Sequence, residues 1–156
     1  MRRLFYVIGI VAVVVVAVIA VGIGVVAYKG NALDTESRAF VDNAVSAIAG
    51  TWTKQQLLER ATPELREKTK PQELTALFDT LSRLGPLVEY EGATGQATMS
   101  YMTGSGGGIS ASYVAKARFR NGGASFRIGL VKRDDQWMIN SFYVDLVPPE
   151  QPGRRI

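Results

Sequence analysis

The feature that most constrains this chain is an uninterrupted run of 25 uncharged residues from Leu4 to Tyr28, dominated by valine, isoleucine and alanine. As an α-helix the run would be about 37 Å long, enough to cross a hydrocarbon core of about 30 Å. A cleaved signal peptide is the alternative, with Val25-Val26-Ala27 as its small-residue site. Because signal peptides carry apolar regions of only about 7 to 15 residues, we predict that residues 1–29 form a retained transmembrane anchor.

The charges that flank the run indicate its orientation. Arg2 and Arg3 precede it with the terminal amine, whereas Lys29 and Arg38 on the far side are diluted by acidic residues. Positive charge favours the cytoplasmic side of a membrane. We therefore predict a single-pass protein of the inner (cytoplasmic) membrane, with a cytoplasmic N-terminus and a periplasmic or otherwise extracytoplasmic C-terminal domain.

The small residues of the run, apart from Gly22, gather on one side of the predicted helix, within about 140° of one another at 100° per residue. A smooth face of this kind lets a second membrane helix approach closely. Alanine and glycine are also common in membrane helices, so the clustering has an ordinary explanation as well. The candidate helix-packing interface consists of Gly9, Ala12, Ala17, Ala20, Gly24 and Ala27.

The composition excludes several classes of function. The chain contains no cysteine and no histidine, which removes thiolate and imidazole chemistry and the usual zinc and haem ligands. Its net charge is +4, but Arg2 and Arg3 precede the anchor, so residues 29–156 carry 16 Lys and Arg against 14 Asp and Glu. Nucleic-acid binding needs a concentrated positive surface. We therefore predict no catalytic residue, no metal, no cofactor and no nucleic-acid partner.

Helical patterns fill the first half of the soluble part. Asp34 is a candidate N-cap for a helix whose apolar residues from Phe40 to Ile48 recur every three or four positions, and Gly50 is expected to end it. Thr53 and Gln56 have capping-box spacing, and the pattern around Pro63 fits either two short helices or one broken helix. A further amphipathic helix is predicted from Pro71 to Leu84, covering a sheet.

From residue 86 the pattern changes to the alternation typical of strands. It predicts four or five strands near 87–91, 96–102, 110–120, 124–132 and 136–146, with hairpin turns at Asn121-Gly122 and Asp134-Asp135. Both faces of the last strand are apolar, which predicts a central or covered position. The fold class is therefore α+β: about three helices on a curved antiparallel sheet, spanning residues 30–147, followed by an extended tail over 148–156.

Alternation also assigns side chains to the two faces of the sheet. Tyr113, Ala115, Ala117 and Phe119 should face the core, as should Phe126, Ile128 and Leu130. The opposite face then carries a candidate docking surface for an acidic partner or for lipid head groups, although exposed charges also serve simply to prevent aggregation. Its residues are Lys116, Arg118, Arg120 and Arg127.

The segment Gly129-Leu-Val-Lys-Arg-Asp-Asp-Gln-Trp-Met-Ile-Asn-Ser-Phe142 resembles the closing hairpin of the cystatin-like superfamily, which includes nuclear transport factor 2 and ketosteroid isomerase. The resemblance covers about 34–147 and implies a cone of helices and curved sheet. With an N-terminal anchor, the arrangement is also similar to inner-membrane assembly factors of type IV secretion systems. The superfamily contains enzymes, carriers and scaffolds, so the fold alone does not give a function.

Two patterns invite an enzymatic or ligand-binding interpretation. An isomerase-like site would need a carboxylate beside tyrosines in an apolar pocket, and Asp145 with Tyr101, Tyr113 and Tyr143 could supply it, although these side chains can equally be core and surface residues. The glycine-rich segment Met102–Ile109 lacks the lysine of a phosphate-binding loop, so we interpret it as a hairpin loop that could order against a partner.

These observations predict a non-enzymatic accessory, assembly or stabilising subunit of a bacterial inner-membrane complex. Its partners would be other membrane-protein subunits and the lipid bilayer, and a second copy of the chain is a further candidate. A membrane-tethered domain that binds a small molecule or a lipid is the alternative, and an isomerase-like enzyme is a weaker one.

Overall fold

The computed structural model describes residues 31–100 and 108–148. The chain divides into two units between Leu33 and Asp34, and the described residues lie almost entirely in the second. The predicted anchor with its small-residue face, the predicted glycine-rich loop up to residue 107 and the tail beyond Pro148 lie outside the described residues. Among residues 31–100 and 108–148, no helix combines the length and the apolar composition that crossing a bilayer requires.

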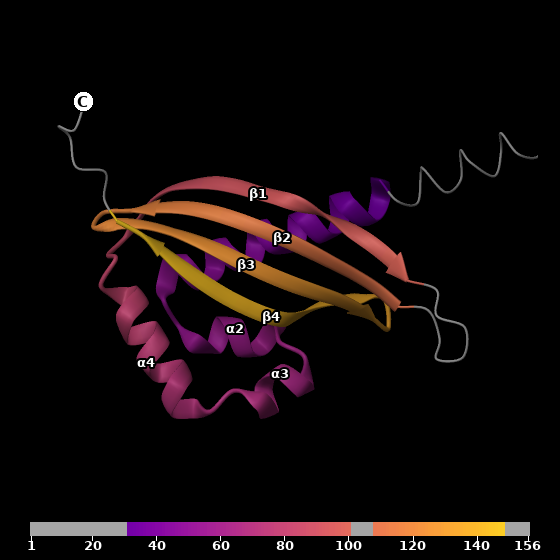
Figure 1. Cartoon of the computed structure of the whole chain (residues 1–156), viewed down its shortest axis with the longest axis horizontal. Helices are drawn as coiled ribbons and strands as arrows, with labels where there is room; N and C mark the ends of the chain where they lie inside the picture. Colours follow the sequence, from indigo (N-terminus) through magenta and orange to yellow (C-terminus); the bar gives the residue numbers. More distant parts are fainter. Residues whose placement is uncertain (1–30, 101–107, 149–156) are drawn as a thin grey trace, which may run out of the picture. The chain divides into compact units, whose positions relative to one another are not determined.

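The described part has an α+β architecture, which confirms the predicted fold class at that level. Helices lie on one face of a curved antiparallel sheet of four strands, whose spatial order follows the sequence (Figure 1). The elements in order are helix 31–51, α2 (Lys54–Arg60), α3 (Pro63–Lys68), α4 (Pro71–Ser82), β1 (Leu87–Ser100), β2 (Gly108–Phe119), β3 (Gly122–Arg133) and β4 (Gln136–Val147).

Helix 31–51 buries the apolar stripe that its spacing predicts, but both of its predicted ends are wrong. Residues 31–33 are already helical, so Asp34 is not an N-cap; its Oδ1 instead accepts a hydrogen bond of 2.6 Å from the backbone N–H of Ala97. The helix also continues past Gly50. Trp52 takes the left-handed conformation that ends it, with φ of 48°, and its N–H donates to the carbonyl of Ile48 at 2.8 Å.

The two readings of the Pro63 region resolve into two separate helices. Thr62 caps α3, since its hydroxyl accepts the N–H of Leu65 at 3.2 Å, and Pro63 occupies the first helical position. Thr53 is the N-cap of α2 as predicted, although its side chain makes no capping bond. The backbone N–H of Thr62 donates to the carbonyl of Ile139 at 2.8 Å, which ties this connection to β4.

The first two predicted strands are one long strand, so the sheet has four strands and not five. A gap was predicted between residues 91 and 96, but β1 passes through Gly92 and Gly95 and continues pairing with β2. Irregular register between Leu87 and Glu89 and between Tyr90 and Gly92 accommodates the bend, and Gly92 has φ of 93°. The first hairpin turn is also displaced by one residue, since Phe119 pairs with Gly122 and leaves Arg120 and Asn121 in the turn.

The last strand was predicted to be central or covered; it is an edge strand and not central, and the connection between α2 and α3 covers its first half. The irregularity lies at Asn140, because Leu130 pairs with Ile139 whereas the next residue of β3, Gly129, pairs with Ser141. The extra residue moves the alternation by one position, so Phe142 and Val144 share the inner face with Ile139. The mixed apolar pattern thus comes from a bulge.

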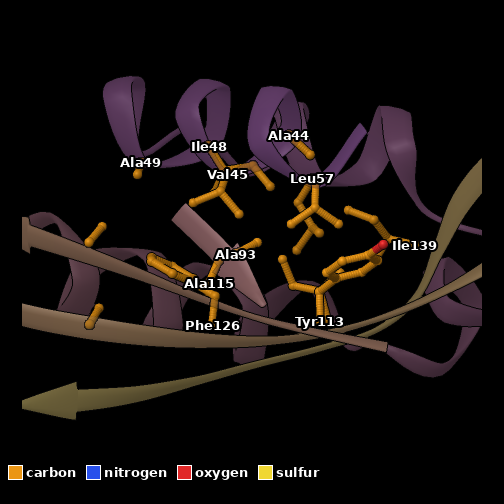
Figure 2. Close-up of a cluster of buried hydrophobic side chains, with 14 of the residues drawn as sticks. Ala44, Val45, Ile48, Ala49, Leu57, Ala93, Tyr113, Ala115, Phe126 and Ile139 are labelled. Atoms are coloured by element: carbon orange, nitrogen blue, oxygen red, sulfur yellow. The ribbon is translucent and has the colours of Figure 1, made fainter. Parts of the chain in front are cut away.

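The core lies between helix 31–51 and the inner face of the sheet. Figure 2 shows Ala44, Val45 and Ile48 pointing from the helix toward Ala115, Phe126 and Tyr113 on the strands. The side chains predicted to face inward on β2 and β3 are all buried. Phe78 and Leu81 of α4 join the same cluster, so the predicted stripe of α4 faces the core.

Candidate functional site: the outer face of the sheet

Side chains occupy the space between helix 31–51 and the sheet. Tyr113 and Phe126 are almost completely buried there. The hydroxyl of Tyr113 lies 2.7 Å from the hydroxyl of Ser37 and donates to the carbonyl of Asp34 at 3.1 Å, so its polar end is satisfied within the fold. A buried tyrosine with these bonds is a structural residue of the core.

The cavity that borders this core is small. It lies among α2, α3, α4 and Phe142, has a volume of about 70 Å³ and is lined mainly by leucines. Ligand pockets usually measure about 300 to 1,000 Å³. This cavity therefore has room for a few water molecules and not for an organic ligand.

The residues considered for isomerase chemistry do not come together. Tyr113 is buried on the inner face, whereas Tyr143 is 60% exposed and lies on the outer face with Asp145. Asp145 accepts a hydrogen bond of 2.9 Å from Nε of Arg127. Tyr101 lies outside the described residues. Asp145 and Tyr143 thus lie on the opposite side of the sheet from Tyr113, so the three side chains do not form one site.

The outer face of the sheet carries the four predicted cations. Lys116, Arg118 and Arg127 point outward from β2 and β3 as alternation predicts, and Arg120 is exposed in the turn. Arg127 is engaged, since it pairs with Asp145 and its guanidinium carbon lies 5.4 Å from the ring centre of Tyr143. Arg118 pairs with Glu89 across the β1–β2 ladder.

The other two cations are available. Within the described part of the chain, neither Lys116 nor Arg120 forms an ion pair. Both side chains are exposed on the same end of the outer face. They are the members of the predicted docking surface that can meet an external anion without breaking a bond in the fold.

A groove of about 590 Å³ lies at this end of the sheet. Lys116, Arg118 and Arg120 line it, together with Glu91 and the end of β4 at Val147 and Pro148. Gly122 and Gly123 also line it, and a Cβ added at Gly123 would lie 3.4 Å from Cβ of Val147. Gly123 pairs with Arg118 on the outer face, so its missing side chain helps to hollow this surface, which we call the basic groove.

A second charged cluster links helix 31–51 to the β3–β4 hairpin. Nζ of Lys132 lies 2.8 Å from Glu36 and 3.5 Å from Asp135, and it sits 5.6 Å from the ring centre of Trp137. The side chain of Lys132 is only 12% exposed. Arg133 pairs with Glu64 of α3 at 2.8 Å. These contacts hold the helices against one end of the sheet and leave the outer face uncovered.

These pairs shift the pKa values of their members. The hydrogen bond from Lys132 lowers the pKa of Glu36, and the same bond raises the pKa of Lys132. The backbone N–H of Glu64 lowers the pKa of its own carboxyl, and Arg133 adds to the effect. Burial raises the pKa of Tyr90, helped by its hydrogen bond of 2.6 Å to Asp42 on helix 31–51.

Stability is therefore expected to fall at both ends of the pH range. Glu36 and Glu64 stabilise the fold fully above the ordinary carboxyl pKa of 4.5, and this contribution is lost as the pH falls through their lowered folded-state values. Tyr90 and Lys132 stabilise it fully below their ordinary values of 10.0 and 10.5, and this contribution is lost at higher pH. Urea midpoints of the full-length chain measured across pH should show a plateau between these limits. The Glu36→Gln, Glu64→Gln variant should lose less stability than the original chain as the pH falls. An equal fall in the urea midpoint of the two chains would contradict a stabilising role for these two carboxylates.

Alternation identified the cations of this surface, but it did not reveal the groove or the ion-pair partners of these cations within the fold. Gly122-Gly123 was the available signal, because a two-residue hairpin turn needs no second glycine in the following strand. Among the described residues, no three Asp or Glu side chains converge as a metal site requires.

Comparisons with protein-family models, with curated proteins and with solved structures give no match for this chain.

Proposed function

We propose that this chain is a non-enzymatic accessory, assembly or stabilising subunit of a bacterial inner-membrane complex. In this proposal the N-terminal helix anchors the chain and packs on membrane partners through Gly9, Ala12, Ala17, Ala20, Gly24 and Ala27. The extracytoplasmic domain contacts partner proteins through the outer face of the sheet. Four helices on one side of a curved antiparallel sheet are compatible with a cystatin-like scaffold.

The two faces of the sheet differ in what covers them, and this difference supports the proposal. The inner face is packed with side chains, whereas the outer face has no described element over it and presents Lys116 and Arg120 beside a groove of about 590 Å³. Uncompensated charges at a hollow surface favour association with a partner of opposite charge. An acidic segment of another subunit is the ligand that such a surface fits.

The test is charge reversal in the basic groove. We expect Lys116→Glu with Arg120→Glu to abolish co-purification of partner proteins with the tagged full-length chain after gentle solubilisation of the membrane. These two residues form no ion pair within the described residues, so their reversal should leave the fold intact. Arg66→Glu with Lys68→Glu on α3 makes the same change in net charge on an exposed helix and serves as the matched control.

The outcomes separate the candidate functions. Partners that remain bound to both variants, or an original chain that is recovered alone, would contradict docking through the groove. The size and charge of the groove also favour a second candidate, a tethered domain that binds an anionic small molecule or lipid head group. In that case the Lys116→Glu, Arg120→Glu variant would keep its protein partners. It would lose the anionic phospholipid that co-purifies with the original chain.

A further inference from the structure

The far edge of β4 is covered along only half of its length. The connection between α2 and α3 covers the first half, through the bridge from Ala61 to Ile139 and the hydrogen bond from Thr62 to the carbonyl of Ile139. Beyond the bulge at Asn140, no described segment pairs with this edge. The segment Ser141–Val147, which we call the open edge, therefore presents unpaired backbone N–H and C=O groups.

Large apolar side chains are exposed along the open edge. Tyr143, Leu146 and Val147 are 60%, 49% and 50% exposed, and Phe142 and Val144 are only partly buried. Proteins usually protect an edge strand with lysines, prolines or bulges in the strand itself. Within Ser141–Val147 there is no lysine and no proline, and the single charged residue, Asp145, is already paired with Arg127.

The opposite edge of the sheet is protected in part. On β1, the carboxylate of Asp34 accepts the N–H of Ala97, and the hydroxyl of Tyr90 donates to Asp42 on helix 31–51. Irregular register near Gly92 bends the same strand. Antiparallel pairing of two β4 edges is symmetric and uses the same edge of both copies, so this contact closes at two subunits.

From these observations we propose that the open edge of β4 pairs antiparallel with the open edge of a second copy, joining two sheets of four strands into one continuous sheet. The open edge has Val144 at its centre, so a two-fold axis there sets Val144 opposite the Val144 of the second copy and uses all seven residues. Phe142 then lies opposite Leu146 of the other copy on the inner face, and no two like charges face each other. A second copy fits this edge because the sequence is complementary to itself in this register.

Cysteine cross-linking of the full-length chain in mild detergent tests the register. The chain has no cysteine, so each variant carries a single thiol. We expect Val144→Cys to give a covalent dimer with a short bis-maleimide, and Ser141→Cys to cross-link with Val147→Cys when the two variants are mixed. Val88→Cys, at an exposed apolar position on β1, is the control and should remain monomeric. A dimer that forms only through the anchor would give no preference for Val144, which would overturn the proposal.

A second variant tests the energetics of the same edge. Leu146→Lys places a charge opposite Phe142 of the other copy and should weaken the dimer about tenfold or more, which corresponds to about 1.4 kcal/mol. Val88→Lys is its matched control, and analytical ultracentrifugation in the same detergent gives both dissociation constants. Equal dimerisation of the two lysine variants, or a monomer at every concentration of the unmodified chain, would overturn the pairing. These results need no other protein, so they are independent of the proposed docking partner.

Discussion

Phe126→Ala is expected to lower the free energy of unfolding by about 3 to 5 kcal/mol, because it removes a fully buried aromatic side chain from a close-packed core. The ring of Phe126 lies 5.9 Å from that of Phe142 and 6.4 Å from that of Trp52, so its loss leaves a cavity between the helix and strand layers. Urea unfolding of the full-length chain in mild detergent, followed by tryptophan fluorescence, measures the change.

The control for this variant is Val88→Ala, which truncates an exposed side chain on β1 and should change the same free energy by less than about 0.5 kcal/mol. The loss of stability in Phe126→Ala also tests whether the space under the sheet binds a ligand. If the space under the sheet were a ligand cavity, Phe126 would line a void and its truncation would cost little. A loss below about 1 kcal/mol would therefore contradict the view that this space is core.

Gly95→Ala is expected to destabilise the fold by about 3 kcal/mol or more, at the upper end of the range for overpacking. A Cβ at this position would lie 2.0 Å from the carbonyl oxygen of Ser112 and 2.8 Å from Cα of Tyr113. Both contacts are with the backbone of β2, so no side-chain rotation relieves them and the β1–β2 ladder has to separate. Thermal and urea unfolding should show the loss together.

Gly50→Ala is the matched control for that substitution. Nothing lies within 4 Å of a Cβ added at Gly50, and the residue is in the last turn of helix 31–51. Alanine is favoured over glycine in a helix by about 0.5 to 1 kcal/mol, so this variant should be slightly more stable than the original. Similar effects at the two glycines would contradict the close approach of β1 to β2.

The predictable parts of this fold are those where the local pattern is regular. Register between β2 and β3 runs without a break, so each of the seven residues that alternation assigned to the inner face of these strands is buried. The predicted strand break near Gly92 and the regular alternation predicted for the last strand were wrong, because β1 between Tyr90 and Gly92 and β4 at Asn140 each carry an extra residue. A bulge depends on which partner residue lies opposite, and a single strand does not specify that.

The candidate site was likewise predictable from the sequence only in part. Alternation predicted the positions of Lys116, Arg118 and Arg127 on the outer face. It could not show which of these cations form ion pairs within the fold. Arg118 is neutralised by Glu89 and Arg127 by Asp145, because these residues meet across neighbouring strands in the observed register. Pairs of this kind depend on tertiary structure, so the sequence could not show which cations remain available to a partner.

Asp34 illustrates how a local signal can serve a distant contact. An aspartate before an amphipathic stripe is typical of an N-cap. Here its carboxylate accepts the N–H of Ala97, 63 residues away in the sequence, and protects the edge of β1.

Site-specific photo-cross-linking in the native membrane tests whether the outer face of the sheet contacts another protein. Val114 points outward from β2, one alternation from Lys116, and Arg66 on α3 is an exposed position on the opposite side of the domain. A photoactivatable phenylalanine analogue at position 114 should give a covalent adduct with another membrane protein, and the same analogue at position 66 should not. An adduct only at position 66, or at neither position, would contradict docking through the outer face.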